Sequence, residues 1–124
     1  KLIEIYPNDV EAYKRRADVH IKLNNHLETV RECSRVIALD STDAWGYLNR
    51  GLAYFRLHLY DKSILDFSRV IEIHHDHAAA YFYRGLVYEE LGREDEVVQD
   101  CKHAARLCHE RAKKYLESKG SHSN

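Results

Sequence analysis

The stretch YLNRGLAYFRLHLYDKSILDFSRVIEI, residues 47–73, decides the fold that this sequence predicts. Its first half places residues at steps of four, three and three, as on one side of an α-helix: Tyr47, Gly51, Tyr54 and Leu57. Its second half holds another helical stripe: Ile64, Phe67, Val70 or Ile71, and Ile73. The residues between the two stripes, RLHLYD at 56–61, leave room only for a tight turn. The stretch therefore predicts a pair of antiparallel helices.

This helix-pair pattern recurs along the chain at a fixed interval, the one that separates Tyr13 from Tyr47 and Tyr47 from Tyr81. The interval relates aromatic, small and apolar positions in three copies: Tyr13, Tyr47 and Tyr81; Ala17, Gly51 and Gly85; Leu23, Leu57 and Leu91; Cys33, Phe67 and Cys101. The small column lets the axes of two paired helices approach to about 8 Å. Because one pair cannot bury both of its apolar stripes, we expect successive pairs to stack on one another.

The pattern resembles the tetratricopeptide repeat, a helical hairpin of roughly 34 residues with an aromatic, a small and a tyrosine position in its first helix. Residues 47–73 and 81–107 carry the pattern best, and residues 13–39 carry it with Ala17 and His20 at the glycine and tyrosine positions. The resemblance implies an all-α fold, a right-handed superhelical solenoid of antiparallel helix pairs. Two features depart from the family pattern: arginine stands in its usual leucine column, at Arg16, Arg50 and Arg84, and the closing proline occurs only as Pro7.

The repeat frame sets the expected domain organisation. We expect, in order, the end of a preceding repeat with its boundary turn at 1–9, full repeats at 10–43, 44–77 and 78–111, a capping helix at 112–120 and a disordered tail at 121–124. The opening IEIYPND at 3–9 has the form of a helix end followed by a boundary turn, which predicts a longer parent array. Near the C-terminus Ala112 and Tyr115 keep the register, but Ser118 and Lys119 stand where a packed face would continue. This pattern is typical of a polar capping helix.

Composition excludes several classes of protein. The 19 Lys and Arg residues stand against 20 Asp and Glu residues, so the formal net charge of -1 gives no reason to expect nucleic acid or anionic lipid as a partner. No apolar run is long enough to span a membrane, and no signal or transit segment is visible. The three cysteines lack CxxC spacing, which favours a reducing compartment and hence the cytoplasm. Cys33 and Cys101 stand in the column of Phe67, where core packing is expected.

The sequence also lacks the signatures of catalysis. No glycine-rich phosphate loop, HExxH or GxSxG motif occurs, so we expect neither an enzyme nor a bound cofactor. The segment EIHHDHAAAY at 72–81 holds three histidines and an aspartate of types that can ligate a metal: His74, His75, Asp76 and His77. They align with residues 40–43 of the preceding copy, in a boundary turn that needs polar helix-capping residues. Because a closed metal site needs three or four converging ligands, we expect a cap and keep a metal site as the weaker alternative.

The family resemblance further implies a function in protein binding. In the family, the first helices of successive repeats line a concave groove, and positions beside the packing stripe face it. In this chain these positions give a candidate peptide-binding groove: Lys14, Arg15, Lys22, Trp45, Leu48, Asn49, Leu52, Phe55, Arg56, Phe82, Tyr83 and Leu86. The apolar members would anchor a peptide of a partner protein, Asn49 would hold a backbone amide, and the basic members would favour acidic residues. We therefore predict a scaffold or adaptor module.

Some members of the family clamp the C-terminal carboxylate of heat-shock chaperones with lysine, asparagine and arginine side chains in this groove. The present chain has Lys14 and Asn49 in frame, but Asp18 replaces an asparagine. Ala79 and Tyr83 replace the two cations of the third repeat. An anionic terminus would lack the charges that match it, so chaperone-tail binding is not predicted.

Two other functions remain open. The truncated first unit could dock on another chain, which would make this a self-associating structural segment of a larger repeat protein. Helical arrays also read RNA, one base per repeat. The near-zero net charge and the acidic Asp18, Glu89 and Glu90 in the groove count against RNA. No membrane partner is expected.

Overall fold

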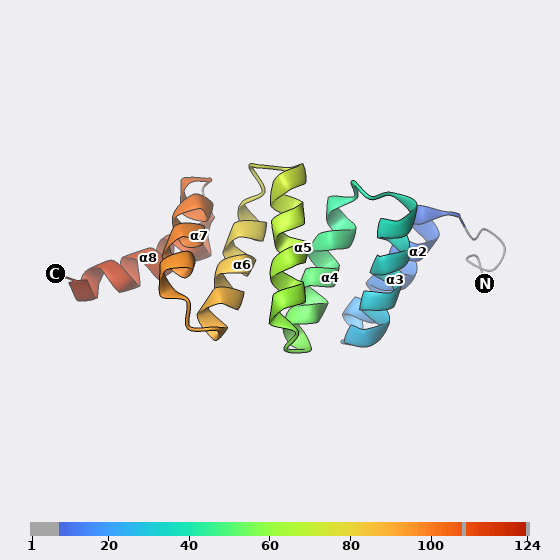
Figure 1. Cartoon of the computed structure of the whole chain (residues 1–124), viewed down its shortest axis with the longest axis horizontal. Helices are drawn as coiled ribbons and strands as arrows, with labels where there is room; N and C mark the ends of the chain where they lie inside the picture. Colours follow the sequence, from blue (N-terminus) through green and yellow to red (C-terminus); the bar gives the residue numbers. More distant parts are fainter. Residues whose placement is uncertain (1–7, 108, 124) are drawn as a thin grey trace. The chain divides into compact units, whose positions relative to one another are not determined.

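The computed structural model describes residues 8–107 and 109–123, which form helices joined by short turns (Figure 1). The helices are α2 (Val10–Lys22), α3 (His26–Leu39), α4 (Ala44–Arg56), α5 (Tyr60–Ile73), α6 (Ala78–Glu90), α7 (Glu94–Arg106) and α8 (Glu110–Ser123). No strand occurs in these ranges, so the predicted all-α class is confirmed. None of the helices in the described part of the chain is both long and apolar enough to cross a lipid bilayer.

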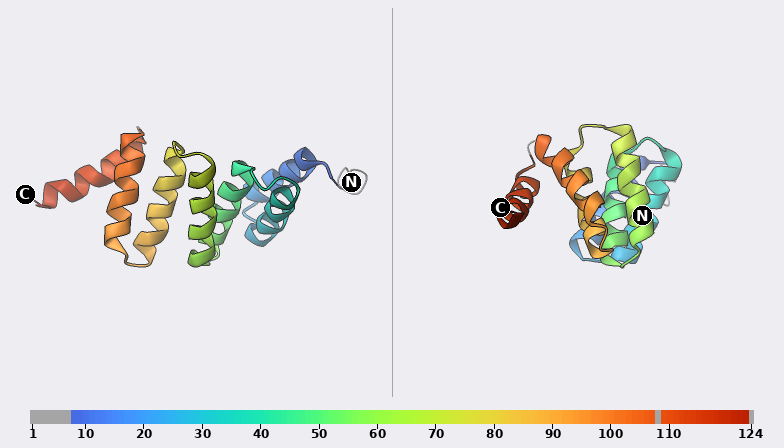
Figure 2. Two further views of the ribbon diagram at one scale, coloured as in Figure 1. Left: turned by 45° about the horizontal axis from the view of Figure 1, so that its top comes forward. Right: turned by 60° about the vertical axis from the view of Figure 1, so that its left-hand side comes forward.

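The chain divides into two compact units, residues 1–66 and 67–124, and the boundary falls inside α5. In the first unit, α3 packs against both α2 and α4. In the second unit, α7 packs against both α6 and α8. Figure 2 shows the consecutive helices of each unit side by side from two further directions. Each unit thus contains the antiparallel helix pair that the repeat pattern predicts.

The core of the first unit consists of residues that the repeat pattern assigned to packing. Ala17 and Cys33 are completely buried, and Tyr13 is nearly so. The small column brings α4 close to the start of α5, where Ser63 Oγ donates a hydrogen bond of 2.8 Å to the carbonyl of Gly51. A bulky side chain at position 51 would separate the two helices and break this contact.

The core of the second unit follows the same columns. Phe67 is completely buried and Cys101 nearly so, which confirms that the cysteines of this column pack in the core. Burial raises the pKa of Cys33 to about 12 and that of Cys101 to about 11, so neither thiol is an available nucleophile. A methyl group at Gly85 would lie 3.4 Å from the Cβ of Asp100, an ordinary contact. The small column therefore accepts alanine, as Ala17 of the first repeat shows, but not a large residue.

The boundary turns provide the helix caps that the sequence predicts. Asp9 Oδ1 accepts two main-chain N–H groups of α2 at 3.0 and 3.3 Å, and Asp43 Oδ1 accepts one of α4 at 2.9 Å. At the equivalent position before α6, His77 Nδ1 accepts the N–H of Ala80 at 3.2 Å. These contacts confirm the capping positions, and they explain how histidine replaces aspartate at the third of them.

The C-terminal helix differs from the capping helix expected at 112–120. Helix α8 begins at Glu110 and ends at Ser123, so it includes residues 121–123 of the expected tail. It begins early because His109, two positions ahead of the repeat frame, accepts the N–H of Ala112 at 3.3 Å through Nδ1. Residues 1–7 of the preceding repeat expected at 1–9 lie outside the described residues, and so does residue 124 of the expected tail.

Candidate functional site

The predicted groove residues of α4 share one side of that helix. They recur every three or four positions and are here called the α4 face: Trp45, Leu48, Asn49, Leu52, Phe55 and Arg56. Arg56 is exposed and the other five are half-buried. The α4 face therefore presents four large apolar side chains, an amide and a cation on a single rigid element.

Lys14 of α2 lies against the beginning of α4. Its Nζ is 2.6 Å from Asp43 Oδ2 and 5.7 Å from the centroid of the Trp45 ring. The hydrogen bond to Asp43 raises the pKa of Lys14, so the ammonium group stays charged while a carboxylate of the same chain balances it. Lys14 thus packs over Trp45 and joins α2 to α4, and it is not a free cation for an acidic ligand.

The other predicted cations differ in their pairing. Lys22 Nζ lies 2.9 Å from Asp18 Oδ2 within α2, in a solvent-exposed pair. Arg15 and Arg56 are exposed, and neither forms an ion pair with another described residue. Of the four predicted cations, these two arginines remain to attract an acidic ligand.

The side chain of Asn49 is partly engaged within its own helix. Its Nδ2 donates to the carbonyl of Trp45 over 2.9 Å. Its Oδ1 has no hydrogen-bond partner among the described residues, so it retains an acceptor for the N–H of a bound backbone. The predicted contact with a peptide amide is therefore compatible with the observed rotamer.

The three predicted residues of α6 occupy different environments in the second unit. Tyr83 and Leu86 are half-buried, and the Tyr83 ring stacks on Phe67 with centroids 5.9 Å apart. Phe82 is only 4% exposed, because His109 stacks on its ring at 4.5 Å. Arg111 also lies over this ring, at 4.8 Å. Phe82 therefore packs under the beginning of α8 and presents no open face.

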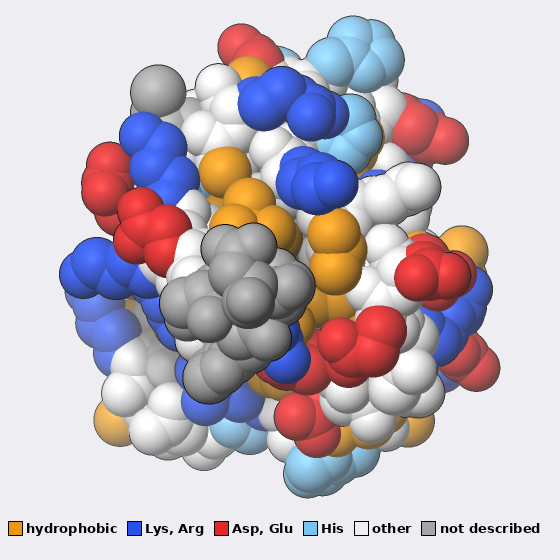
Figure 3. Space-filling model, turned by 90° about the vertical axis from the view of Figure 1, so that its left-hand side faces the viewer, with side chains coloured by type: hydrophobic (Ala, Val, Ile, Leu, Met, Phe, Trp, Pro, Cys, Tyr) orange, Lys and Arg blue, Asp and Glu red, His pale blue; other side chains and the backbone are white. Residues whose placement is uncertain are grey.

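Hydrophobic side chains do reach the surface elsewhere in the second unit. Figure 3 faces the C-terminal end of the chain, and hydrophobic groups are visible there among charged ones. The half-buried residues that border the core of this unit include Tyr83, Leu86 and Leu116. Tyr83, Leu86 and Leu116 are only half-buried there, in contrast to Phe82.

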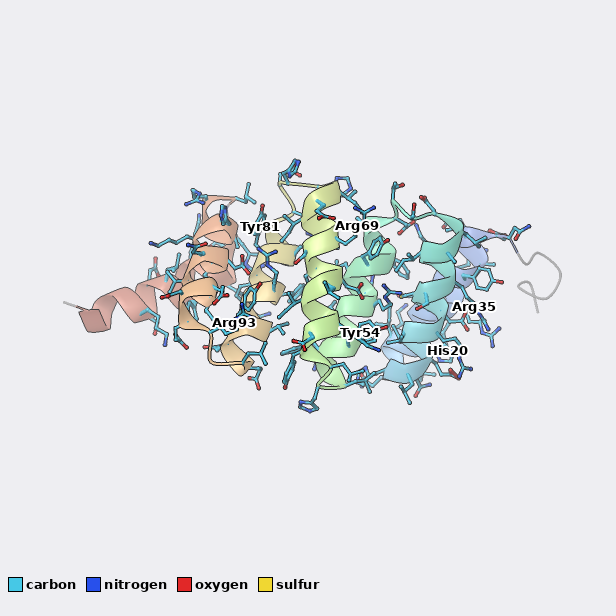
Figure 4. All side chains as sticks on the ribbon, viewed as in Figure 1. His20, Arg35, Tyr54, Arg69, Tyr81 and Arg93 are labelled. Carbon is cyan, nitrogen blue, oxygen red and sulfur yellow. The ribbon has the colours of Figure 1, made fainter. Side chains whose placement is uncertain are left out.

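The arginine column, which the sequence left unexplained, links consecutive helices in the first unit. Arg50 of α4 donates through Nε and Nη2 to both carboxylate oxygens of Asp66, at 2.8 and 2.9 Å, and through Nη1 to Ser34 Oγ at 3.1 Å. The rings of Tyr47 and Tyr54 lie 5.8 and 5.7 Å from its guanidinium carbon (Figure 4). One guanidinium thus joins α3, α4 and α5.

The second unit repeats this arrangement around Arg84. Its Nε and Nη2 donate to Asp100 at 2.8 and 2.7 Å, and its Nη1 donates to Ser68 Oγ at 3.0 Å. Tyr81, labelled in Figure 4, and Tyr88 lie 5.8 and 5.9 Å from its guanidinium carbon. The repeat interval also relates the partners, in an acidic column of Glu32, Asp66 and Asp100 and a serine column of Ser34 and Ser68. That recurrence is the signal that could have predicted the contact.

The pKa shifts of the paired groups reflect the hydration that burial of the ion pair removes. The hydrogen bond to Asp66 raises the pKa of Arg50. Burial raises the pKa of the Asp66 carboxyl although Arg50 acts in the opposite direction. The pair therefore loses hydration, which its two parallel hydrogen bonds offset.

One of the three histidines of the third boundary turn caps a helix. His74 and His75 are exposed, and His77 uses Nδ1 to cap α6. Within the described residues, no group of three or more His, Cys, Asp or Glu side chains is placed to hold a metal ion. The geometry of the turn fits capping and offers no assembled metal site.

Comparison with known proteins identifies the repeat. The family model "Tetratricopeptide repeat" matches residues 44–77, the second predicted repeat. No curated protein sequence matches the chain. Together with the structures below, the model confirms the resemblance seen in the sequence.

Three solved structures illustrate the similarity. The Arabidopsis OM64 TPR domain has a TM-score of 0.84 and 25% identity, over 91% of this chain and 95% of that one. The first TPR domain of Spaghetti (RPAP3), bound to the HSP90 peptide SRMEEVD, has a TM-score of 0.84 and 19% identity, over 93% and 94%. A crystal structure of MamA has a TM-score of 0.83 and 23% identity over 86% of this chain. The chain spans 62% and 57% of two MamA chains that it matches, less than two thirds of their length.

Proposed function

We propose that this chain, whose residues 44–77 match the tetratricopeptide repeat, is a protein-interaction module whose α4 face binds a peptide segment of a partner protein. The observation that carries the proposal is that Trp45, Leu48, Leu52 and Phe55 lie along one side of α4 and are only half-buried, whereas the core residues of the unit are fully buried. Large apolar side chains on one rigid helix are typical anchors of protein interfaces. The peptide held by the similar Spaghetti domain supports a peptide as the class of ligand.

The charges around the α4 face favour a particular peptide. Arg15 and Arg56 carry positive charge without an ion-pair partner among the described residues, so acidic side chains on the ligand would meet a complementary charge. Asn49 Oδ1 would accept one backbone N–H of the ligand. We propose an internal segment with apolar residues spaced to contact the α4 face and at least one flanking acidic residue.

A free C-terminal carboxylate is a poorer ligand for this chain. The in-frame Lys14 already pairs with Asp43 at 2.6 Å. Ala79 and Tyr83 stand where the chaperone-binding members of the family have cations. These features support an internal peptide rather than a chaperone tail as the partner.

Truncation of the α4 face tests this proposal. We expect Leu48→Ala combined with Leu52→Ala to weaken binding by on the order of tenfold to a hundredfold, because each removes an apolar contact of about 1 kcal/mol or more. Peptides selected from a random display library on the wild-type chain provide the ligand, and calorimetric titration measures the dissociation constants. Circular dichroism of the variant should retain the wild-type helicity.

The matched control is Leu65→Ala, since Leu65 is a highly exposed leucine of the first unit that lies outside the α4 face. It should bind the selected peptides as the wild type does. Equal affinity of the wild type and the α4-face variant would contradict the proposal. A library that yields no apolar and acidic peptides would contradict the assigned ligand chemistry.

Self-association is a second candidate function, favoured by an exposed apolar surface at the end of the first unit. Val19, Leu23 and Leu27 are 55%, 63% and 70% exposed there. Ala53 and Val87, which occupy the position of Val19 in the later repeats, are buried. The position of Val19 is thus covered in the later repeats and open in the first one, and we propose that a second copy of the chain covers it together with Leu23 and Leu27.

The repeats themselves suggest the variant that tests this association. The positions equivalent to Leu27 in the later repeats are Asp61 and Asp95, so Leu27→Asp should preserve the helix. It should also disfavour an apolar contact between two copies of the chain. Sedimentation equilibrium over a wide concentration range should show a dimer for the wild type and a monomer for the variant. A monomeric wild type at every concentration would exclude this candidate.

A further inference from the structure

The helices of the two units begin on different capping residues. Helices α2 and α4 begin after Asp9 and Asp43, whose carboxylates accept main-chain N–H groups. Helix α6 begins after His77, and α8 begins after His109, each of which accepts an N–H through Nδ1 at 3.2 and 3.3 Å. The two kinds of cap respond differently to acid.

An imidazole nitrogen accepts a hydrogen bond only while the ring is neutral. Protonation turns both ring nitrogens into donors, so Nδ1–H would face a main-chain N–H. The added positive charge would also lie at the positive end of the helix dipole. An imidazole in water has an ordinary pKa of about 6.5, so this acceptor is of a kind that mild acid can remove.

His109 has a second contact that joins α8 to α6. Its ring stacks on Phe82 of α6 at 4.5 Å, and its main-chain N–H donates to the Ala104 carbonyl of α7 at 3.0 Å. Ala112 in the first turn of α8 is completely buried. The imidazole therefore begins α8 and also covers the ring of Phe82.

The surroundings of His109 disfavour its protonated form. Burial lowers the pKa of His109, and the nearby Arg111 lowers it further, whereas Glu110 acts in the opposite direction. From α6 the facing group is the uncharged Phe82 ring, and from α7 it is a backbone carbonyl. Because the folded chain binds this proton less readily than the unfolded chain, stability is complete above about pH 6.5 and falls as the pH drops below it.

We propose that His109 makes the docking of α8 on α6 depend on pH, so that mild acid releases α8 and uncovers Phe82. Helices α2 and α4 begin on aspartate and not on histidine, so the helix starts of the first unit serve as an internal reference. This switch involves the second unit only and does not depend on peptide binding by the α4 face.

Hydrogen exchange measured by mass spectrometry at about pH 7.5 and about pH 5.5 tests the switch, with intrinsic exchange rates corrected for pH. In the wild-type chain, amides of α8 should lose protection by up to about tenfold at the lower pH, the limit that one proton of ordinary pKa about 6.5 allows, while those of α2 and α3 keep theirs. His109→Asn supplies a cap that does not titrate, and its α8 should keep the same protection at both values. His77→Asn leaves His109 in place, so its α8 should respond as in the wild type.

A second variant, His109→Asp, supplies the carboxylate that caps α2 and α4, so it gives the same test if the asparagine variant folds poorly. Its α8 should also be insensitive across this range. The proposal is overturned if the wild-type α8 keeps its protection at the lower pH. It is equally overturned if both His109 variants lose protection to the same extent as the wild type.

Discussion

Replacing Asp100 with alanine should lower the free energy of unfolding by about 3–5 kcal/mol, which is the usual cost of removing one partner from a buried ion pair. The side chain of Asp100 is 3% exposed and that of Arg84 is 20% exposed. Without the carboxylate, the guanidinium group would keep its charge and only the hydroxyl of Ser68 as a polar partner. Urea unfolding followed by circular dichroism measures the loss.

The double variant Arg84→Leu with Asp100→Ala distinguishes the loss of the ion pair from the effect of leaving one charge unpaired. Leucine is the usual family residue at the position of Arg84, and an apolar replacement of a buried pair is often close to neutral. We therefore expect the double variant to be more stable than Asp100→Ala alone. Equal instability of both variants would mean that lost packing, and not an unpaired charge, causes the effect.

An exposed ion pair provides the surface control. Arg69 and Glu72 of α5 lie 3.0 Å apart with side chains 42% and 65% exposed. Glu72→Ala should cost about 1 kcal/mol or less, since water screens such pairs. The contrast with Asp100→Ala tests whether burial decides the value of an arginine–carboxylate contact in this chain.

The helix pairs could be predicted from the sequence because packing imposes a period. A residue such as Gly85 must be small wherever two helices approach, and Phe67 must be apolar wherever a second helix packs on the first. Both demands recur once in every repeat, so the sequence alone displays them. The arginine column also recurs, but hydrophobic periodicity does not predict that Arg84 finds its carboxylate partner in Asp100 of the following helix.

The turns within the repeats show where such prediction ends. Asn24, His58 and Gly92 occupy equivalent positions in the three repeats and have positive φ values of 57°, 62° and 72°. Gly92 indicates this conformation most clearly by its residue type, because glycine adopts it without strain. Asn24 and His58 adopt it because the tight connection between paired helices requires it, and that requirement is tertiary.

The candidate site was less predictable than the fold because its residues depend on neighbours outside the repeat frame. Lys14 was expected to attract an acidic ligand, but the cap of α4 places Asp43 beside it. Phe82 was expected to face the groove, but α8 begins two residues early and brings His109 onto its ring. Five residues of the α4 face are half-buried, so neighbouring groups such as Lys14 over Trp45 limit how much of it is accessible. The repeat pattern of the family therefore predicts which side of a helix faces the groove, and local packing decides which residues on that side are accessible.

Phe67→Ala should also destabilise the chain strongly, by about 3–5 kcal/mol, since Phe67 is completely buried and its removal leaves a cavity. The ring stacks on Tyr83 at 5.9 Å, so the cavity would open beside α6. Thermal unfolding and urea unfolding measure the effect, and the wild-type chain and Phe67→Leu serve as references. The leucine variant should lose clearly less, because leucine fills most of the same volume.

The other residues in the column of Phe67 allow a comparison by side-chain volume. Cys33 and Cys101 occupy the same position in the neighbouring repeats and are just as buried, yet their side chains are far smaller. Cys101→Ala should therefore cost only about 1 kcal/mol, since it removes a single heavy atom from a similar environment. Equal costs for Phe67→Ala and Cys101→Ala would show that the column tolerates cavities by collapse. A loss of stability that grows with the volume removed would show instead that the core of each repeat is rigid. In that case the Phe67 ring fills a space in the middle repeat that neighbouring side chains fill around Cys33 and Cys101.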